Sequence, residues 1–271
     1  MEFALNHMAC PSMGVCDVLD IAAHLGCVGV ELRNDLRAPL FDELGAQATG
    51  NKARQRGLRL LALAEIPSFN TPSDATIAEA EALIDHAKVS GAEAISLIPR
   101  NDDLGIENGE RQANLQSSLE ALKPLLKDAG IMGFIEPLGF VSSSLRSKRE
   151  AIEAIVTVDG EQNFRIIHDT FHHHLAGEMD VFPEMTGIVH ISGVDDNRVA
   201  PGDLRDAHRG LVGPQDRLGN IAQIKSLLAG GYAGPFSFEP FANEIHTMES
   251  PQNAIAESME FIRSYLSAKA A

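Results

Sequence analysis

The chain has 271 residues, 44% of them hydrophobic and 22% charged, a composition typical of a globular protein that buries a sizeable core. Its formal net charge of -16 argues against nucleic acids and anionic membrane surfaces as partners, because clustered Lys and Arg bind both. Three cysteines without CxxC spacing, no signal-peptide pattern and no apolar run of the roughly 18 residues that span a bilayer favour a cytoplasmic protein.

Eight short apolar runs predict β-strands that are buried on both faces. They are too short for helices and are expected to start near Phe3, Val28, Leu58, Glu93, Ile131, Phe164, Gly187 and Pro235. Several of them follow a helical segment that ends in glycine, the residue that favours the left-handed position after a helix. Such pairs are Leu25-Gly26, Arg56-Gly57, Ser90-Gly91 and Ala129-Gly130.

The segments between these runs carry the apolar spacing of amphipathic helices. Apolar side chains recur every three or four residues at positions 77, 80, 84 and 87, at 115, 119, 122 and 126, and at 255, 259, 262 and 266. Thr71-Pro72 and Ser250-Pro251 are predicted to be helix N-caps, each followed by proline in the first turn.

Eight strand and helix repeats without a break in composition predict one α/β domain over residues 1–271, a single (β/α)8 TIM barrel. One connection differs from the others. The polar segment 192–217, rich in Gly, Asp and Arg, separates the seventh and eighth predicted strands. A connection of this length on a barrel is predicted to be functional.

Four metal-ligand residues stand at the ends of the last four predicted strands: Glu136, Asp169, His190 and Glu239. The carboxyl ends of barrel strands converge at one rim, where active sites of this fold lie. Three carboxylates and one imidazole suit one divalent metal ion. The residues do not discriminate among Mn²⁺, Zn²⁺, Co²⁺ and Mg²⁺.

A metal ion at this rim would act as a Lewis acid on a carbonyl and an adjacent hydroxyl. Glu136 and Glu239 are expected to face each other across the ring, where each could bind the ion through one oxygen and offer the other as a base. These two are the predicted catalytic pair, which would transfer a proton through an enediolate. Asp169 and His190 are expected only to hold the metal.

A histidine run, His172 to His174, follows Asp169. His172 is predicted to lie over the metal and to hydrogen-bond the substrate, with a structural loop histidine as the alternative. His173 and His174 are expected to be structural. His168 is out of phase with Asp169 on the strand, so it should face the helix layer.

Other charged and polar residues are expected at the same rim. Arg209, in the long polar segment, could place a fixed positive charge beside an enediolate oxygen, or could form a salt bridge that pins the loop. Asn6 and Glu31, at the ends of the first two strands, are candidates for substrate binding, and Arg33 and Glu65 are candidates for the pocket wall. The alternative for Glu31 is a pair with Arg33 or another neighbour.

At these residues the chain resembles the xylose isomerase superfamily of TIM barrels and, within it, the inosose (2-keto-myo-inositol) isomerases of inositol catabolism. The resemblance rests on Ile135-Glu136-Pro137-Leu138-Gly139, His168-Asp169-Thr170-Phe171-His172, Val189-His190-Ile191-Ser192, Phe238-Glu239-Pro240-Phe241 and Asp206-Ala207-His208-Arg209. It implies that Glu136, Asp169, His190 and Glu239 bind one divalent metal and that His172 and Arg209 lie beside the substrate.

The leading hypothesis is a metal-dependent isomerase or epimerase of a keto-polyol or ketose, such as an inosose, with a ketose 3-epimerase as the alternative. A hydrolase of the endonuclease-four type shares the fold but needs more histidine ligands and a basic face. A non-catalytic sugar-binding subunit is the third class. A small sugar or cyclitol is the expected partner, and the sequence leaves a homo-oligomer open.

Overall fold

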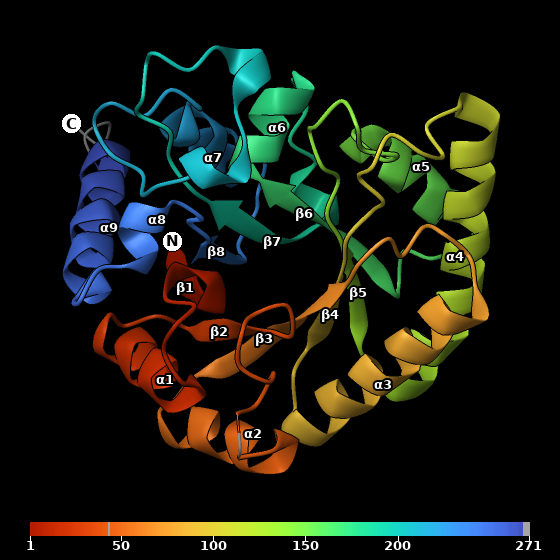
Figure 1. The fold of residues 1–271 in the computed structure, drawn as a ribbon, viewed down its shortest axis with the longest axis horizontal. Helices are drawn as coiled ribbons and strands as arrows, with labels where there is room; N and C mark the ends of the chain where they lie inside the picture. Colours follow the sequence, from red (N-terminus) through yellow and green to blue (C-terminus); the bar gives the residue numbers. More distant parts are fainter. Residues whose placement is uncertain (43, 268–271) are drawn as a thin grey trace.

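Eight parallel strands close into a barrel in the computed structural model, which describes residues 1–42 and 44–267 (Figure 1). The strands are β1 Glu2–Asn6, β2 Gly29–Arg33, β3 Arg59–Ile66, β4 Ala94–Leu97, β5 Met132–Ile135, β6 Phe164–Asp169, β7 Thr186–Ile191 and β8 Pro235–Phe238. Each strand pairs with its neighbours in chain order, and β1 closes the ring against β8. The predicted (β/α)8 TIM barrel is confirmed, and every strand starts within one residue of its predicted position.

Helices surround the barrel on its outside (Figure 1). They are α1 Val15–His24, α2 Ala46–Gln55, α3 Asp74–Ser90, α4 Asn108–Ala129, α5 Lys148–Thr157, α6 Thr170–Ala176, α7 Asn220–Ala229, α8 Asn243–His246 and α9 Pro251–Ser267. Short 3-10 turns lie at His7–Ala9, Pro183–Met185, Pro201–Asp203 and Asp206–His208. In the described residues no helix combines the length and the apolar character that crossing a membrane requires.

One predicted helix start is wrong and another is confirmed. Helix α3 begins at Asp74, and its cap is Ser73, whose hydroxyl accepts a hydrogen bond from the Thr76 amide. The backbone carbonyl of Thr71 instead accepts a hydrogen bond from the Thr76 hydroxyl, and Thr71 lies outside the helix. Two hydroxyl residues flank Pro72, and only the extended backbone of Ser73 orients its oxygen toward the free amides. Helix α9 begins at Pro251, as predicted.

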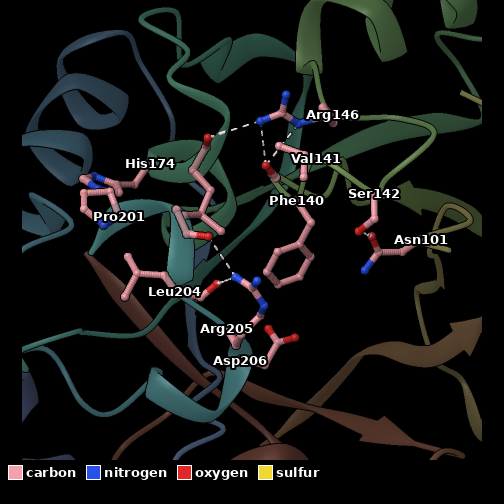
Figure 2. Close-up of a pocket in the computed structure, with 13 residues that line it drawn as sticks. Asn101, Phe140, Val141, Ser142, Arg146, His174, Pro201, Leu204, Arg205 and Asp206 are labelled. Carbon is pink, nitrogen blue, oxygen red and sulfur yellow. Dashed lines mark hydrogen bonds between the residues drawn. The ribbon is translucent and has the colours of Figure 1, made fainter. Parts of the chain in front are cut away.

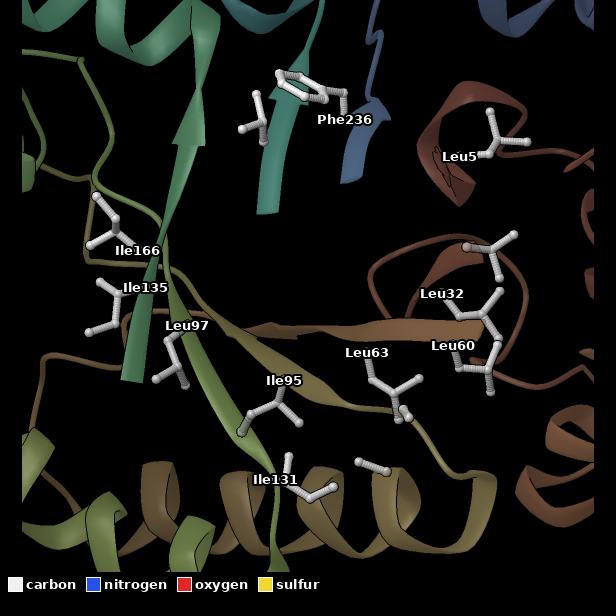
Figure 3. Close-up of a cluster of buried hydrophobic side chains, with 14 of the residues drawn as sticks. Leu5, Leu32, Leu60, Leu63, Ile95, Leu97, Ile131, Ile135, Ile166 and Phe236 are labelled. Carbon is white, nitrogen blue, oxygen red and sulfur yellow. The ribbon is translucent and has the colours of Figure 1, made fainter. Parts of the chain in front are cut away.

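The main core lies between the barrel and the helices. Figure 3 shows strand residues of this layer, among them Leu5, Leu63, Ile95 and Phe236. The four leucines at 115, 119, 122 and 126 on α4 pack into the same cluster and are buried, which confirms their predicted helical face. Burying one such side chain stabilises the fold by about 1.5–3 kcal/mol.

A second, smaller cluster comes from strands alone and fills the barrel interior, with Ile167 and Ile188 among its members. Because side chains alternate along a strand, Val189 packs outward and His190 points inward. The same alternation points Asp169 inward and His168 outward, where its Nε2 lies 2.9 Å from Gln223 on α7. The expectation that His168 faces the helix layer is confirmed.

Candidate active site

The four predicted ligand residues meet at the carboxyl rim of the barrel. Glu136 directly follows β5, Asp169 ends β6, His190 lies near the end of β7, and Glu239 directly follows β8. All four are buried, and one ligand atom from each lies within 4.8 Å of the others. Ligand atoms held at about 2.0–2.2 Å from a shared ion lie within about 4.4 Å of one another. Small side-chain rotations would therefore suffice to bind one ion.

Glu31 orients the imidazole of His190. Oε2 of Glu31 lies 3.0 Å from His190 Nε2, while Oε1 accepts hydrogen bonds from Ser237 at 2.5 Å and from Asn6 at 3.3 Å. Glu31 Oε2 accepts from the ring, so His190 Nε2 is the donor and Nδ1 is the nitrogen that can bind an ion. A carboxylate behind the distal nitrogen is the usual support of a metal-binding histidine.

His190 Nδ1 is buried and makes no hydrogen bond of good geometry among the described residues. It lies 3.1 Å from Glu239 Oε2 and 3.6 Å from Glu136 Oε1, and in the ion-free site these carboxylates favour a proton on it. A bound cation would satisfy this nitrogen and both oxygens together. The donor set therefore fits a divalent metal ion.

Two guanidinium groups hold the carboxylates in place. Arg209 Nη2 binds Asp169 Oδ2 at 2.5 Å and Glu239 Oε2 at 2.9 Å, and Arg33 Nη1 binds Glu239 Oε1 at 2.7 Å. Asp169 Oδ1 caps helix α6 by accepting the backbone amides of Phe171 and His172. Two of the three ligand carboxylates, those of Asp169 and Glu239, are thus oriented before any ion binds.

The buried charges at this rim do not balance among themselves. Among the described residues, four buried carboxylates, those of Glu31 and the three acidic ligands, face two buried guanidinium groups, those of Arg33 and Arg209. Buried charges are costly unless they are paired; in the ion-free site a proton on His190 offsets part of this excess, and a divalent cation would offset it in place of that proton.

The pKa values of the ligands show the same imbalance. Burial and the charge of Glu239 raise the pKa of Glu136 to about 7. Burial alone would lower the pKa of His190, but the charges of Glu239, Glu31 and Glu136 outweigh burial and raise it well above its ordinary value. Burial would raise the pKa of Glu239, but His190, Arg209 and Arg33 hold it below its ordinary value.

A cavity of about 190 Å³ lies above the ligands, lined in part by Glu136, Glu239, Arg33, Arg209 and His172. The backbone amide of Gly139 donates to His172 Nδ1 at 3.2 Å, which leaves Nε2 as the donor nitrogen of the ring. Burial lowers the pKa of His172, so the ring is neutral at pH 7. A Cβ on residue 139 would lie 2.4 Å from the His172 carbonyl, so only glycine permits this approach.

The remaining predicted site residues occupy different places. Asn6 and Glu31 lie behind the ligands, where Asn6 also binds Glu239 Oε1 at 3.1 Å, and neither lines the cavity. Arg209 forms the predicted salt bridge with Asp206 of its own loop at 3.1 Å and also lines the cavity, while its role beside an enediolate oxygen stays a prediction. His173 contacts Lys148.

Sequence reasoning missed some contacts at this site. The Ser237 hydroxyl donates a hydrogen bond to Glu31, and the Ser192 hydroxyl accepts one from Arg209. The centre of the Phe241 ring lies 4.4 Å from the Arg209 guanidinium. The inward phase of Ser237, two residues before Glu239, was a usable signal. The positions of Ser192 and Phe241 depend on the course of the loops, so the sequence held no signal for their contacts.

Solved structures share this fold. A xylose isomerase domain containing protein from Salmonella typhimurium LT2 is 29% identical over 98% of this chain and 97% of that chain, with a TM-score of 0.88. The IolI protein with a binding zinc atom is 18% identical over 98% of this chain and 100% of that chain, with a TM-score of 0.83. A D-allulose 3-epimerase from Methylomonas sp. is 18% identical over 98% of both chains, with a TM-score of 0.74.

The last two likenesses concern the fold alone, because their sequence identity is low. Among curated protein sequences, no significant match was found. The family model described as Xylose isomerase-like TIM barrel matches residues 19–265. The chain therefore belongs to the xylose isomerase-like TIM barrel family.

Proposed function

We propose that this protein is a metal-dependent isomerase or epimerase that moves a proton between adjacent carbons of a keto-polyol or ketose. The observation that carries the proposal is the convergence of three carboxylates and one histidine, all buried, beneath a small cavity at the strand ends. The cluster holds a single histidine, which does not favour the histidine-rich site of an endonuclease-four-type hydrolase.

Glu136, Asp169, His190 and Glu239 would hold the ion. When bound, the ion supplies Lewis acidity to the substrate carbonyl and the neighbouring hydroxyl. Glu136 and Glu239 approach the cavity from β5 and β8, so one carboxylate can take the proton from the carbon beside the carbonyl. The electron pair of the broken C–H bond forms the enediolate, and the partner carboxyl returns a proton to the adjacent carbon or the opposite face.

Two cavity residues would act on the substrate oxygens. His172 presents a neutral ring with Nε2 as its donor, which suits a hydroxyl or carbonyl oxygen. Arg209 places a permanent positive charge where an enediolate oxygen gains negative charge, and such preoriented charges stabilise transition states. Both groups are buried, so water competes little with the substrate for their donors.

We further propose an inosose, a cyclic keto-polyol, as the substrate. The segments that resemble inosose isomerases supply all four ligands, and the cavity of about 190 Å³ suits one ring-sized molecule. A ketose 3-epimerase is the second candidate, supported by the likeness in fold to the D-allulose 3-epimerase.

A screen of inososes and ketohexoses tests the proposal. Turnover should be lost on chelation and return with Mn²⁺ or Zn²⁺, and NMR in D₂O should detect deuterium at the carbon that exchanges its proton. Glu239→Gln should lower kcat by about 10²–10⁴-fold while the fold is retained, because it removes a base. Glu178→Gln is the matched control, since Glu178 pairs with Lys148 at 3.1 Å and, among the described residues, forms no ion pair or hydrogen bond with a ligand. Unchanged turnover in Glu239→Gln would reject the mechanism.

A further inference from the structure

A second, larger pocket adjoins the candidate active site. It has a volume of about 460 Å³ and lies between the loop after β5, helix α6 and segment 201–206 (Figure 2). Asn101, Phe140 and Asp206 line both this outer pocket and the inner cavity, so the two are neighbours with a shared wall. None of the residues proposed above to bind metal lines the outer pocket.

The sizes of the two spaces suggest different roles. Ligand pockets usually enclose about 300–1,000 Å³. The outer pocket falls in this range with about 460 Å³, whereas the inner cavity, about 190 Å³, lies below it. A substrate that reacts in the inner cavity and carries a further substituent would place that substituent in the outer pocket.

Two arginines face this outer pocket across the Phe140 ring (Figure 2). Arg146 binds the Gly139 carbonyl at 2.8 Å through Nη2, and Arg205 binds the Leu204 carbonyl at 2.7 Å through Nη1. Carbonyls orient both groups without neutralising them, and in the described part of the chain neither forms an ion pair. Nη1 of Arg146, together with Nε and Nη2 of Arg205, makes no hydrogen bond there.

The acidic residue of this pocket is already engaged. Asp206 lines the pocket, and its Oδ1 accepts from Arg209 Nη1 at 3.1 Å, a guanidinium that also pairs with Asp169 and Glu239. Two arginines with free donors outnumber this one carboxylate in the lining of the outer pocket, in a protein whose formal net charge is -16. Guanidinium donors preferentially bind carboxylate and phosphate oxygens.

We infer that the outer pocket binds an oxyanion, a phosphate or carboxylate group carried by the substrate at the end remote from its reacting carbonyl. The inference rests on the proposed isomerase or epimerase and, within that function, favours a keto-polyol or ketose that carries an anionic substituent over an unsubstituted inosose. Arg146 and Arg205 would bind the oxyanion, while the Phe140 side chain would pack against the carbon chain that joins the two ends.

Binding measurements with three ketoses test this inference. D-fructose, D-fructose 6-phosphate and D-fructuronate differ only at carbon 6, and calorimetry on the metal-loaded protein measures an apparent Kd for each, at equilibrium with any isomer that forms. We expect the better of the two anionic ketoses to bind at least about tenfold more tightly than D-fructose, since charge-assisted hydrogen bonds are strong. Whichever anion binds more tightly identifies the group as phosphate or carboxylate.

Arg205→Gln should remove most of the anion advantage and leave the Kd of D-fructose unchanged. Arg198→Gln is the matched control, because Arg198 carries the same charge in the same connection and its side chain is 85% exposed. Arg146→Lys, which keeps the charge but loses the planar fork, should weaken anion binding less than Arg205→Gln does. Unchanged melting temperatures would verify the folding of all three variants.

Equal Kd values for the three ketoses would overturn the inference, and so would equal losses in Arg198→Gln and Arg205→Gln. The proposed function fails separately, because binding is measured apart from turnover. An anion preference without turnover of any inosose or ketose would keep the outer pocket and reject the isomerase. Turnover of neutral ketoses without an anion preference would keep the isomerase and reject the oxyanion site in the outer pocket.

Discussion

Substitution of Glu31 by glutamine should weaken metal binding although Glu31 is not a ligand. Its Oε1 accepts from Ser237 and Asn6, and its Oε2 accepts from His190 Nε2 at 3.0 Å. An amide nitrogen in place of Oε2 would place its N–H opposite the N–H of His190 Nε2, so that two donors would face each other. The ring would then carry its proton on Nδ1, the nitrogen that faces Glu239 and Glu136.

The expected loss of metal affinity follows from the loss of the hydrogen bond between Glu31 and His190. Removing the hydrogen-bond partner of a metal ligand typically costs about 10–100-fold in affinity, or about 1.4–2.7 kcal/mol. Rotation of the new amide by half a turn would restore the acceptor for His190, but it would set the amide nitrogen against the Asn6 donor. Neither orientation satisfies all three neighbours of Glu31, so we expect the loss in both.

Calorimetric titration of metal-stripped protein with Zn²⁺ or Mn²⁺ measures the effect. Glu65→Gln is the matched control, because it makes the same substitution at the same rim, where Glu65 pairs with Arg33 at 3.2 Å and does not contact His190. We expect the control to change the Kd by less than about threefold, because Glu65 contacts none of the four proposed ligands. Wild-type affinity in Glu31→Gln, or an equal loss in Glu65→Gln, would refute the reasoning about the imidazole.

Two further predictions concern stability. Zn²⁺ at 100 times its Kd should add about 2.7 kcal/mol and raise the melting temperature by roughly 5–10 °C, an increase that Asp169→Asn should largely lose in thermal scans. Burial and the charge of Lys148 lower the pKa of His173 to about 4, so the stability from its neutral ring is present above pH 6.5 and is lost as the pH falls toward 4. In urea titrations, His173→Gln should therefore lose about 1–2 kcal/mol less than wild type between pH 7 and pH 4.5, allowing for partial exposure, and an identical pH dependence would contradict this.

Short-range patterns in the sequence determined most of the barrel and the members of the candidate metal cluster. Strand phase alone places Asp169 and His190 on the inner face and His168 on the outer face, because side chains alternate along every strand. The order of strand ends around a ring then brings the ligands to one rim. Such patterns fail where two neighbouring residues suit one role, as Thr71 and Ser73 do for the cap of α3.

Only the tertiary structure decided what supports the ligands. The bond between Arg33 and Glu239 joins residues 206 positions apart, and the pair of Glu31 and His190 spans 159. No local period encodes such partners, because they depend on closure of the barrel and on the rotamers that packing permits. The outer pocket, where Arg146 and Arg205 approach from separate loops, likewise exists only once those loops have folded over the rim.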